Sequence, residues 1–503
     1  MPLGRRELLR ASGAAAVTSL LPACEPPPPP PSGRFAWGVA SGDPTPRSVI
    51  LWTRLAVSEA ETLEVELFDD PEARRLVTTA SATAEPSRDG CVKLDVEGLA
   101  PGHVYYYRFR ALDGVSPMGR TRTLPEGPLA QVRLGVVSCS NYAAGFFHVY
   151  RHLADRPDLW AIVHLGDTIY EYADGEYGAL RALDPPGLCL SLEDYRRRHA
   201  RYRTDLDAQA ALRQHPLLAV WDDHEFANNA SRDGAPGHDP VTMGPWSDRV
   251  AAARRAFFEW MPVRDETRVH RALVLGDLAR LILLDTRMDE RDPAPLDVAD
   301  WNREDRRIVS DAQERWLVDL LSESDVRYTL VGNQVLLAPF PAMNNVDAWD
   351  GYPAQRGRVL GAIEASPAPV VVLTGDTHSS YAFDLPGPGY DAATQRGAIG
   401  VEWGASAISS PTLASDPREA ERVLLAGTPH LRFTEQEHRG FVLLDLRPAR
   451  ARAELWLIDD VTTPDAAPPR LVRAFETTAA DRACREVDAT PSRLDGAAPP
   501  PAP

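Results

Sequence analysis

The sequence predicts an α/β domain preceded by an all-β domain. In the longer C-terminal part, short apolar segments such as VRLGVV, LWAIVHLG and PVVVLTG alternate with amphipathic segments such as SDRVAAARRAFFEWM and DAQERWLVDLLSE. Buried strands bounded by helices indicate sheets that are covered on their outer faces. In the N-terminal part, apolar residues occupy alternate positions, as at Leu63, Val65 and Leu67, which is typical of half-buried antiparallel strands. We therefore expect an all-β domain over 35–125 and an α/β domain over 130–480.

The first residues have the features of an export signal. Arg5 and Arg6 precede an apolar stretch that is shorter than the about 20 residues needed to cross a bilayer. The segment RRELLRASGAAAV resembles a twin-arginine signal, and LPAC resembles a lipobox that would make Cys24 the acylated first residue. We expect a twin-arginine lipoprotein signal over 1–24 and a stiff Pro-rich tether over 25–34, hence a periplasmic or cell-surface protein anchored to a membrane through Cys24. Cleavage at another small-residue site and a disordered basic N-terminus are the alternatives.

The composition limits the classes of partner. The chain has 503 residues, enough for two or three domains, and a formal net charge of −18. No basic surplus is present to replace the counterions of a polyphosphate backbone, so we expect no binding to nucleic acid. We also expect a monomer. The Pro- and Ala-rich C-terminus lacks the pattern of a packed element, and 481–503 is predicted to be a disordered tail. Three cysteines have no assigned role, and the sequence leaves open whether two of them form a disulfide: Cys91, Cys189 and Cys484.

Polar residues at the ends of apolar strands are the strongest functional signal. They are Cys139 in VVSCS, Asp167 and Tyr170 in VHLGDTIYEY, Asp223 in AVWDDHE, and Asp376 and His378 in VVLTGDTHSS. Each segment is typical of a short buried strand that stops at a turn, and such loops are where a rigid sheet presents reactive groups. Together these residues predict one metal site.

The ligand types indicate a site with two kinds of metal. Thiolate and phenolate donors such as Cys139 and Tyr170 favour a ferric ion or another strongly Lewis-acidic metal, whereas Asp223 and Asp376 offer the hard oxygens that calcium or magnesium prefers. A carboxylate shared between two cations would let a bridging hydroxide form near neutral pH, and the same cations would hold phosphate oxygens. The pattern therefore predicts phosphoester hydrolysis.

Each motif also has a purely structural interpretation. A Gly-Asp pair at a strand end is often only a turn, Cys139 an inert buried thiol, and His378 a hydrogen-bonded loop residue. His224, next to Asp223, would either donate a hydrogen bond to the phosphoryl oxygen or leaving group, or pair with an acidic neighbour. The joint occurrence of the motifs favours the metal site, with His224 and Asp167 as catalytic residues.

The same motifs, together with a further series along the chain, resemble the PhoD-type alkaline phosphatases, a branch of the calcineurin-like metallophosphoesterases. The series includes SLEDYRRRHARYRTD, WDDHEFANN, LLDTR, LVGNQVLLAP, NNVDAWDGYP and VEWGASAISSP. The resemblance implies a four-layer α/β metallophosphatase sandwich with the metal site at one sheet edge. LAPGHVYYYRF resembles the tyrosine-bearing corner of immunoglobulin or fibronectin-like sandwiches, so the all-β domain is expected to be of that kind.

The resemblance also implies the cofactors and the reaction. Fe3+ would be held by Cys139, Asp167, Tyr170 and His378, and Ca2+ by Asp167, Asp223 and Asp376, with Asn228, Asn229 and Asn333 as further oxygen donors. The expected function is an exported alkaline phosphatase that hydrolyses small phosphomonoesters. A phosphodiesterase, including a phospholipase D-like hydrolase, is the first alternative, and a non-catalytic ligand-binding surface lipoprotein is the second.

Overall fold

The computed structural model describes residues 33–295, 297–465 and 467–503. The predicted signal over 1–24 lies outside the described residues, as does the predicted tether apart from Gly33 and Arg34. Among the described helices, none combines the length and the apolar character needed to cross a membrane.

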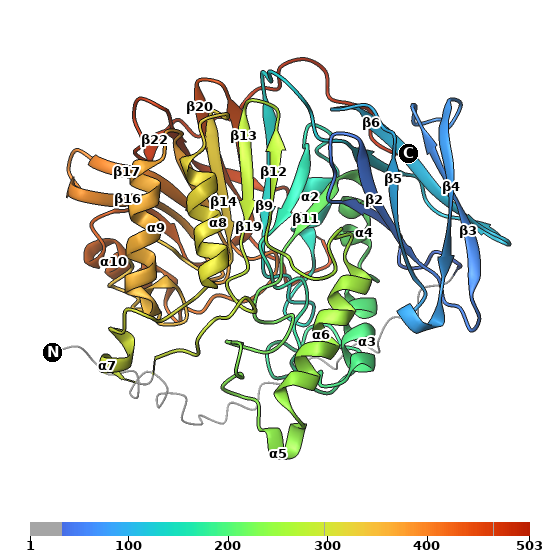
Figure 1. The fold of residues 1–503 in the computed structure, drawn as a ribbon, viewed down its shortest axis with the longest axis horizontal. Helices are drawn as coiled ribbons and strands as arrows, with labels where there is room; N and C mark the ends of the chain where they lie inside the picture. Colours follow the sequence, from blue (N-terminus) through green and yellow to red (C-terminus); the bar gives the residue numbers. More distant parts are fainter. Residues whose placement is uncertain (1–32, 296, 466) are drawn as a thin grey trace.

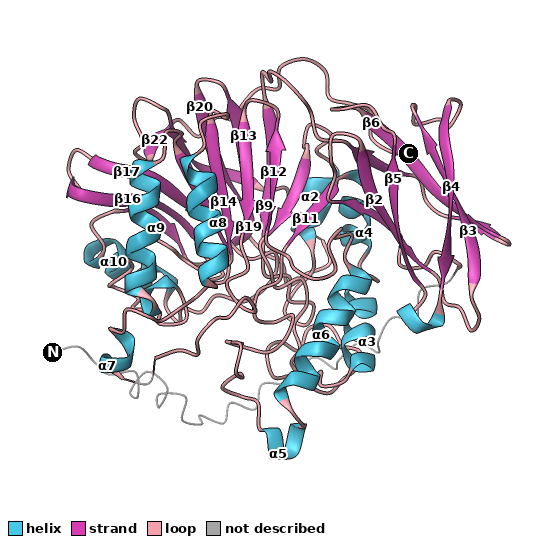
Figure 2. Ribbon diagram, viewed as in Figure 1, coloured by secondary structure: helices cyan, strands magenta, loops and turns pink. Residues whose placement is uncertain are grey.

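A ten-stranded mixed sheet forms the largest element of the fold (Figures 1 and 2). β9, β10, β11 and β1 run parallel at its centre, and the strands at both ends pair in antiparallel fashion. In spatial order its strands are β22 (Arg485–Val487), β21 (Arg470–Thr477), β20 (Arg450–Ile458), β19 (Arg439–Arg447), β9 (Val132–Val137), β10 (Ala161–His164), β11 (Pro216–Ala219), β1 (Val39–Gly42), β2 (Ser48–Arg54) and β5 (Cys91–Glu97).

Two smaller sheets complete the strand structure. The seven-stranded sheet has the order β12 (Arg271–Leu275), β13 (Ala279–Leu283), β14 (Tyr328–Asn333), β15 (Val370–Thr374), β17 (Arg396–Gly404), β16 (Ser380–Asp391) and β18 (Leu431–Glu435). The five-stranded sheet contains β4 (Leu76–Ala84), β3 (Glu61–Phe68), β6 (Val104–Ala111) and β7 (Gly114–Val115), with β8 (Gly119–Arg122) also paired to β6.

The helices lie on the outer sides of the two larger sheets. Figure 1 shows α8 (Asp311–Ser322) and α9 (Pro353–Ala365) across the seven-stranded sheet. Along β13, Leu281 belongs to the core shared with the ten-stranded sheet, whereas Ile282 belongs to the core under α8 and α9. Alternate side chains of a strand point to opposite faces, so β13 is buried on both sides. The expected helix-covered sheets are therefore present.

The remaining helices surround the strand ends. α2 (His148–Ala154) packs so closely on β9 that a Cβ at Gly135 would lie 2.9 Å from a Leu153 methyl group. A capping box between Ser191 and Asp194 starts α3, because a side chain there satisfies an amide that the first turn leaves unpaired. The others are α3 (Leu192–Tyr202), α4 (Leu206–Gln214), α5 (Pro240–Met243), α6 (Trp246–Trp260), α7 (Val298–Trp301) and α10 (Pro417–Gly427).

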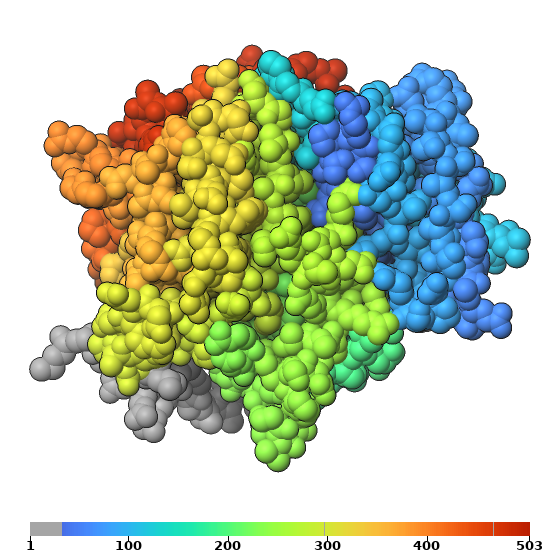
Figure 3. Space-filling model, viewed as in Figure 1, coloured from blue at the N-terminus to red at the C-terminus, as the bar shows by residue number. Residues whose placement is uncertain are grey.

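The N-terminal region is all-β, as predicted, but it is not separated from the α/β domain by a break in the sheet. β1 pairs with β11 in parallel, and β2 and β5 extend the same ten-stranded sheet. The five-stranded sheet packs against this extension, where Leu51 shares a core with Val65 and Phe109. In Figure 3 the blue N-terminal surface lies directly against the green surface of α6. The predicted domain boundary at residue 125 therefore does not separate two sheets, because strands on both sides of it belong to the ten-stranded sheet.

The prediction of a disordered tail over 481–503 is wrong. β22 pairs with β21, and Ala502 is buried and exchanges two 2.9 Å hydrogen bonds with the Gln214 side chain. The Tyr106 hydroxyl donates to the Pro500 carbonyl at 2.7 Å. Side chains from distant parts of the chain therefore satisfy the backbone of a segment that has no apolar period of its own.

The cysteines in the described part of the chain are buried free thiols, which leaves no disulfide among them. They are Cys91, Cys139, Cys189 and Cys484.

Candidate metal centre

The predicted ligands lie beyond the ends of parallel strands. β9, β10 and β11 lead into Cys139, Asp167 and Asp223, whereas β15 of the other sheet leads into Asp376 and His378. Parallel strands end at the same edge of a sheet, and the two larger sheets pack face to face. The polar residues that follow these four strands therefore lie together at one edge of the two packed sheets.

The two sheets meet tightly at this edge. An isolated parallel bridge joins Ser138 to Ala407, and Gly375 lies against Ser138. A Cβ at Gly375 would be only 2.7 Å from the Ser138 Cβ, so a larger residue would push the ligand loops apart.

Several ligand residues adopt a backbone conformation that is uncommon for residues other than glycine. The φ angles are 60° at Cys139, 57° at Asp167, 65° at Asp376 and 59° at His378. Such angles cost free energy and persist where the surroundings impose them. At Asp167 the surroundings include the Glu225 carboxylate, which accepts the Asp167 amide at 3.0 Å.

One group of ligands combines a thiol, a carboxylate, a phenol and an imidazole. Candidate ligand atoms of Cys139, Asp167 and His378 lie within 4.8 Å of one another. The Tyr170 hydroxyl donates to Asp167 Oδ2 at 3.0 Å and lies 3.1 Å from His378 Nε2. All four side chains are buried. The structure therefore brings together the four residues predicted to hold the iron.

Two further groups consist mainly of carboxylates, and one of them shares Asp167 with the first group. Asp167, Asp223 and His224 form one compact set, and Asp222, Asp223 and Asp376 form another. Asp223 Oδ1 is buried without a hydrogen-bond partner, and so is Asp222 Oδ2. Buried carboxylate oxygens without a donor are costly unless a cation is bound, so these residues fit a metal site. Sequence reasoning missed Asp222, although it precedes Asp223 in the quoted motif.

Protonation of the ligands follows from burial. Burial raises the pKa of the Cys139 thiol and of the Tyr170 hydroxyl well above their usual values. Burial also raises the pKa of Asp167, with Asp223 adding to the shift and His224 opposing it. The pKa of His378 falls to about 3, again because of burial. A bound cation would favour the anionic forms of the thiol, phenol and carboxylate and the neutral imidazole, which are the states that metals require.

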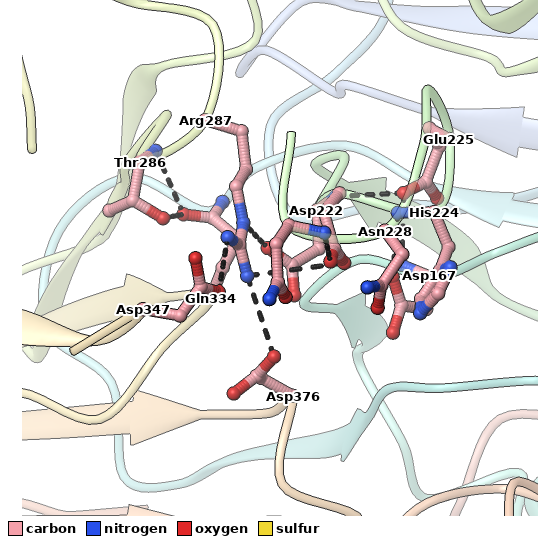
Figure 4. A network of polar contacts seen from close by, with 12 residues as sticks. Asp167, Asp222, His224, Glu225, Asn228, Thr286, Arg287, Gln334, Asp347 and Asp376 are labelled. Atoms are coloured by element: carbon pink, nitrogen blue, oxygen red, sulfur yellow. Dashed lines mark hydrogen bonds and ion pairs between the residues drawn. The ribbon is translucent and has the colours of Figure 1, made fainter. Parts of the chain in front are cut away.

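Arg287 neutralises part of the carboxylate group and was not predicted. This fully buried guanidinium donates to Asp222, to Asp347 Oδ2 at 2.6 Å and to Asp376 Oδ1 at 3.4 Å. Figure 4 shows Arg287 between Asp222 and Asp376, with Asp347 beside it. Burial opposes the charge, but the surrounding carboxylates raise the pKa of Arg287 well above its usual value. The LLDTR motif contains this arginine, yet an arginine in a sequence gives no sign of being buried.

His224 faces the same site from the other side. Its Nδ1 lies 2.8 Å from Glu171 Oε2, and its ring lies 4.2 Å from the Tyr170 ring, measured between centroids. Burial lowers the pKa of His224, but Asp223, Glu171 and Asp167 outweigh it and raise the pKa well above its usual value. Hydrogen bonding through Nδ1 leaves Nε2 as the free nitrogen of the imidazolium.

Four of the predicted ligands line a cavity of about 390 Å³, namely Asp167, Asp223, Asp376 and His378, whereas Cys139 and Tyr170 do not line it. Its walls include Asp167, Tyr172, Tyr177, Asp223, His224, Asn228, Asn229, Met343, Asn344, Asn345, Asp347, Asp376, Thr377, His378 and Leu413. Asn228 and Asn229 are therefore placed at the cavity, as the prediction of further oxygen donors requires. Asn333 is not, because its amide donates to the Val335 carbonyl and its oxygen accepts from Trp349 Nε1 at 3.3 Å. The prediction for Asn333 is wrong because that residue ends a buried strand.

A carboxylate shared by two adjoining ligand groups at the edge of a helix-covered sheet is the arrangement that metal-dependent hydrolases of phosphoric esters use, and the protein is of this class. Comparison with known proteins specifies the family. A family model described as PhoD-like phosphatase matches residues 134–455, and one described as PhoD-like phosphatase, N-terminal domain, matches 22–125. The chain belongs to the PhoD-like phosphatase family, which confirms the resemblance seen in its motifs.

Two similar proteins support this assignment. Alkaline phosphatase D of Bacillus subtilis (strain 168) is 34% identical over 468 residues, which cover 86% of this chain and 79% of the relative. A solved structure described as "Structure of PhoD" has a TM-score of 0.84 and 32% identity, and the match covers 92% of this chain and 93% of that one.

Proposed function

We propose that the protein is an exported enzyme that hydrolyses small phosphomonoesters with ferric iron and calcium as cofactors. The observation that carries the proposal is that Cys139 and Tyr170 lie beside Asp167 and His378, which line the same cavity as Asp223. Asp223 Oδ1 is buried and has no hydrogen-bond partner, with Arg287 Nη2 3.9 Å away. The name of the Bacillus subtilis relative, alkaline phosphatase D, supports the same substrate class.

The two ligand groups suit two different cations. Cys139, Tyr170 and His378, with Asp167, would hold iron, because thiolate and phenolate donors suit a ferric ion. Asp223 and Asp376, with Asp167, would hold calcium, which prefers oxygen ligands. When bound, such cations supply Lewis acidity that neutralises phosphoryl oxygens and activates water.

His224 would act as the proton donor. Its Nδ1 is bonded to Glu171, which fixes the ring, and Nε2 carries the proton that reaches the leaving-group oxygen. Asn228 donates its backbone amide to the other oxygen of Glu171 at 2.7 Å, so the carboxylate cannot rotate freely. The role of this histidine is therefore proton transfer supported by a fixed partner.

The cavity also favours a second candidate, a phosphodiesterase that includes the phospholipase D-like type. Met343 and Leu413 add an apolar wall beside the acidic ligands, and this wall would take a second ester substituent. A non-catalytic surface lipoprotein is not favoured, because Asp167, Asp223, Asp376 and His378 line one cavity and Cys139 and Tyr170 lie beside them.

The finer fold assignments belong to the proposal as well. Two sheets packed between outer helices support a four-layer metallophosphatase sandwich. The Tyr105 hydroxyl accepts the Ala100 amide at 2.9 Å, which supports a tyrosine corner of the immunoglobulin or fibronectin kind in the N-terminal region.

Export through the twin-arginine route and anchoring at Cys24 rest on sequence alone. Replacing Arg5 and Arg6 with lysine should leave precursor in the cytoplasm, and Cys24→Ala should release activity into the soluble fraction. Cell fractionation of both variants tests this, and unchanged distributions would exclude the proposed route and anchor.

Metal analysis combined with parallel assays tests the catalytic proposal. The purified enzyme should contain iron and calcium and should hydrolyse a phosphomonoester faster than the matching diester. The Asp167→Asn variant should lose both metals, whereas the exposed Asp305→Asn control should keep them. A preference for diesters would move the function to the second candidate, and full activity without metal would exclude both.

A further inference from the structure

A small second cavity lies behind the metal-ligand loop. It measures about 30 Å³, and its polar lining comes from Ser140, Tyr150, His164, His199, Tyr202 and Arg203. Thr168 and Ile169, which lie between the metal ligands Asp167 and Tyr170, form another part of its wall. A single water needs about 10–15 Å³ of this kind of space, so the cavity has room for two or three waters.

The charge of Arg203 is buried in this cavity wall without a carboxylate. Its side chain is 5% exposed, and burial lowers its pKa to about 10, so the group is still charged at neutral pH. One nitrogen, Nη2, donates to the Trp260 carbonyl at 3.1 Å, and the guanidinium lies 4.3 Å from the Trp52 ring centroid. The other, Nη1, is buried without a hydrogen-bond partner.

Arg203 makes fewer hydrogen bonds than other buried arginines: Arg198, which also has no carboxylate partner in the described part of the chain, donates to the carbonyls of Tyr170, Pro185 and Gly187. Arg287 bonds to Asp222 and Asp347, and Arg291 also bonds to Asp347. No carboxylate within residues 33–295, 297–465 and 467–503 forms an ion pair with Arg203. A buried charge without a counter-charge is costly, so the site calls for an anion that the polypeptide does not supply.

The other polar groups of the lining can donate hydrogen bonds, and the remainder of the lining is apolar, from Phe147, Ile169, Ala208, Leu212, Leu217 and Met261. His199, one helical turn before Arg203, has a buried Nε2 without a partner, and burial together with Arg203 lowers its pKa to about 3. This imidazole is therefore neutral at neutral pH and donates from one nitrogen. His164 accepts the Gly166 amide at Nδ1 over 3.3 Å, which places its proton on Nε2, 3.5 Å from the Ser140 hydroxyl.

We propose that this cavity binds one monovalent anion of halide size, such as chloride, as the counter-ion of Arg203. The cavity volume admits a single-atom anion and excludes a tetrahedral oxyanion such as phosphate, so the site is separate from substrate binding. A cation is excluded by the guanidinium. The bound anion supports the segment that carries Asp167 and Tyr170 from behind and links halide binding to the stability of the folded enzyme.

Bromide provides a direct probe, because its anomalous scattering identifies it in a crystal. Crystals of the metal-loaded wild-type enzyme grown in sodium bromide should show a bromine peak beside Arg203 Nη1. In solution, replacing sodium gluconate with sodium chloride at constant ionic strength should raise the melting temperature saturably by roughly 1–3 °C.

The Arg203→Met variant should lose this chloride response, because methionine keeps much of the side-chain volume but no charge. Arg197→Met is the matched control on the same helix: Arg197 is exposed and paired with Asp184, so this variant should keep the wild-type response. A crystal with bromine peaks only at the surface, or a chloride response that persists in Arg203→Met, would overturn the proposal. If Arg203→Met does not fold, the presence or absence of a bromine peak beside Arg203 Nη1 in the wild-type crystal tests the proposal.

Discussion

Replacing Arg287 with methionine should destabilise the metal-free enzyme by about 3–5 kcal/mol, because removing one partner of a buried ion pair leaves the other charge uncompensated. Arg287 is fully buried, and its guanidinium lies 2.6 Å from Asp347, 3.4 Å from Asp376 and 3.9 Å from Asp223, in addition to its bond to Asp222. Methionine fills much of the same space, so the loss reports mainly on charge.

The carboxylate most affected should be Asp222. Burial raises the pKa of Asp222 to about 7, although Arg287 opposes the shift. In Arg287→Met this opposition is removed, so the Asp222 carboxylate should take up a proton or move out of its buried position. Adding Asp222→Asn to Arg287→Met should therefore recover part of the lost stability, because the amide has no charge to leave unpaired.

Urea denaturation in the presence of a chelator, followed by tryptophan fluorescence, measures the free energy of unfolding. Arg303→Met serves as the control, because Arg303 pairs with Asp300 and Asp305 at the surface and should leave the midpoint unchanged. A loss of no more than about 1 kcal/mol for Arg287→Met, the value typical of an exposed pair, would refute the reasoning. If Asp222→Asn does not recover stability in the Arg287→Met background, Asp222 is not the carboxylate whose unpaired charge causes the loss.

Three further predictions concern the metal ligands and the proton donor. Cys139→Ala should lose iron and most activity while keeping its circular dichroism spectrum; iron-replete, active protein would show that the thiol is only a core residue. A calcium-selective chelator should abolish activity while iron remains bound, since thiolate and phenolate hold iron more firmly, and added calcium should restore it; a chelated enzyme that stays active would contradict the calcium role. Glu171→Gln should lower the pKa of His224, because the variant removes one of the carboxylates that raise it. The protonated donor is then lost at lower pH, so the alkaline limb of the kcat profile should move to lower pH; an unmoved limb would exclude His224 as the donor.

The strand-end ligands could be predicted because their local sequence carries two signals at once. A short apolar run ending in a polar residue, as before Asp167 and Asp376, indicates both a buried strand and a side chain at its end. Local sequence does not show which strands pair with one another. The prediction that these residues meet in one site therefore rested on the resemblance of the motifs to a known family. Glu171 and Arg287 were missed for another reason: charged residues are usually exposed, and only long-range packing shows that these two are buried.

The same limitation explains the C-terminal segment. Residues near Ala502 have neither an apolar period nor a helix signal, and they are held by Gln214, Tyr106 and Arg120, which lie far away in the sequence. Contacts of this kind depend on the completed fold. The regular strands and helices were therefore accessible from patterning, whereas the ordered tail and the shared sheet were not.

The continuity of the ten-stranded sheet limits how this enzyme can be recombined. Cutting the chain at residue 125 would remove β1 from β11 and expose a strand edge that can pair with other molecules. β11 leads directly into Asp223, so damage at that edge would reach the carboxylate ligands. Gene fusions should therefore transfer 35–503 as one unit, because β22 and the segment around Ala502 also belong to the packed structure, whereas β4 lies at the far edge of the five-stranded sheet.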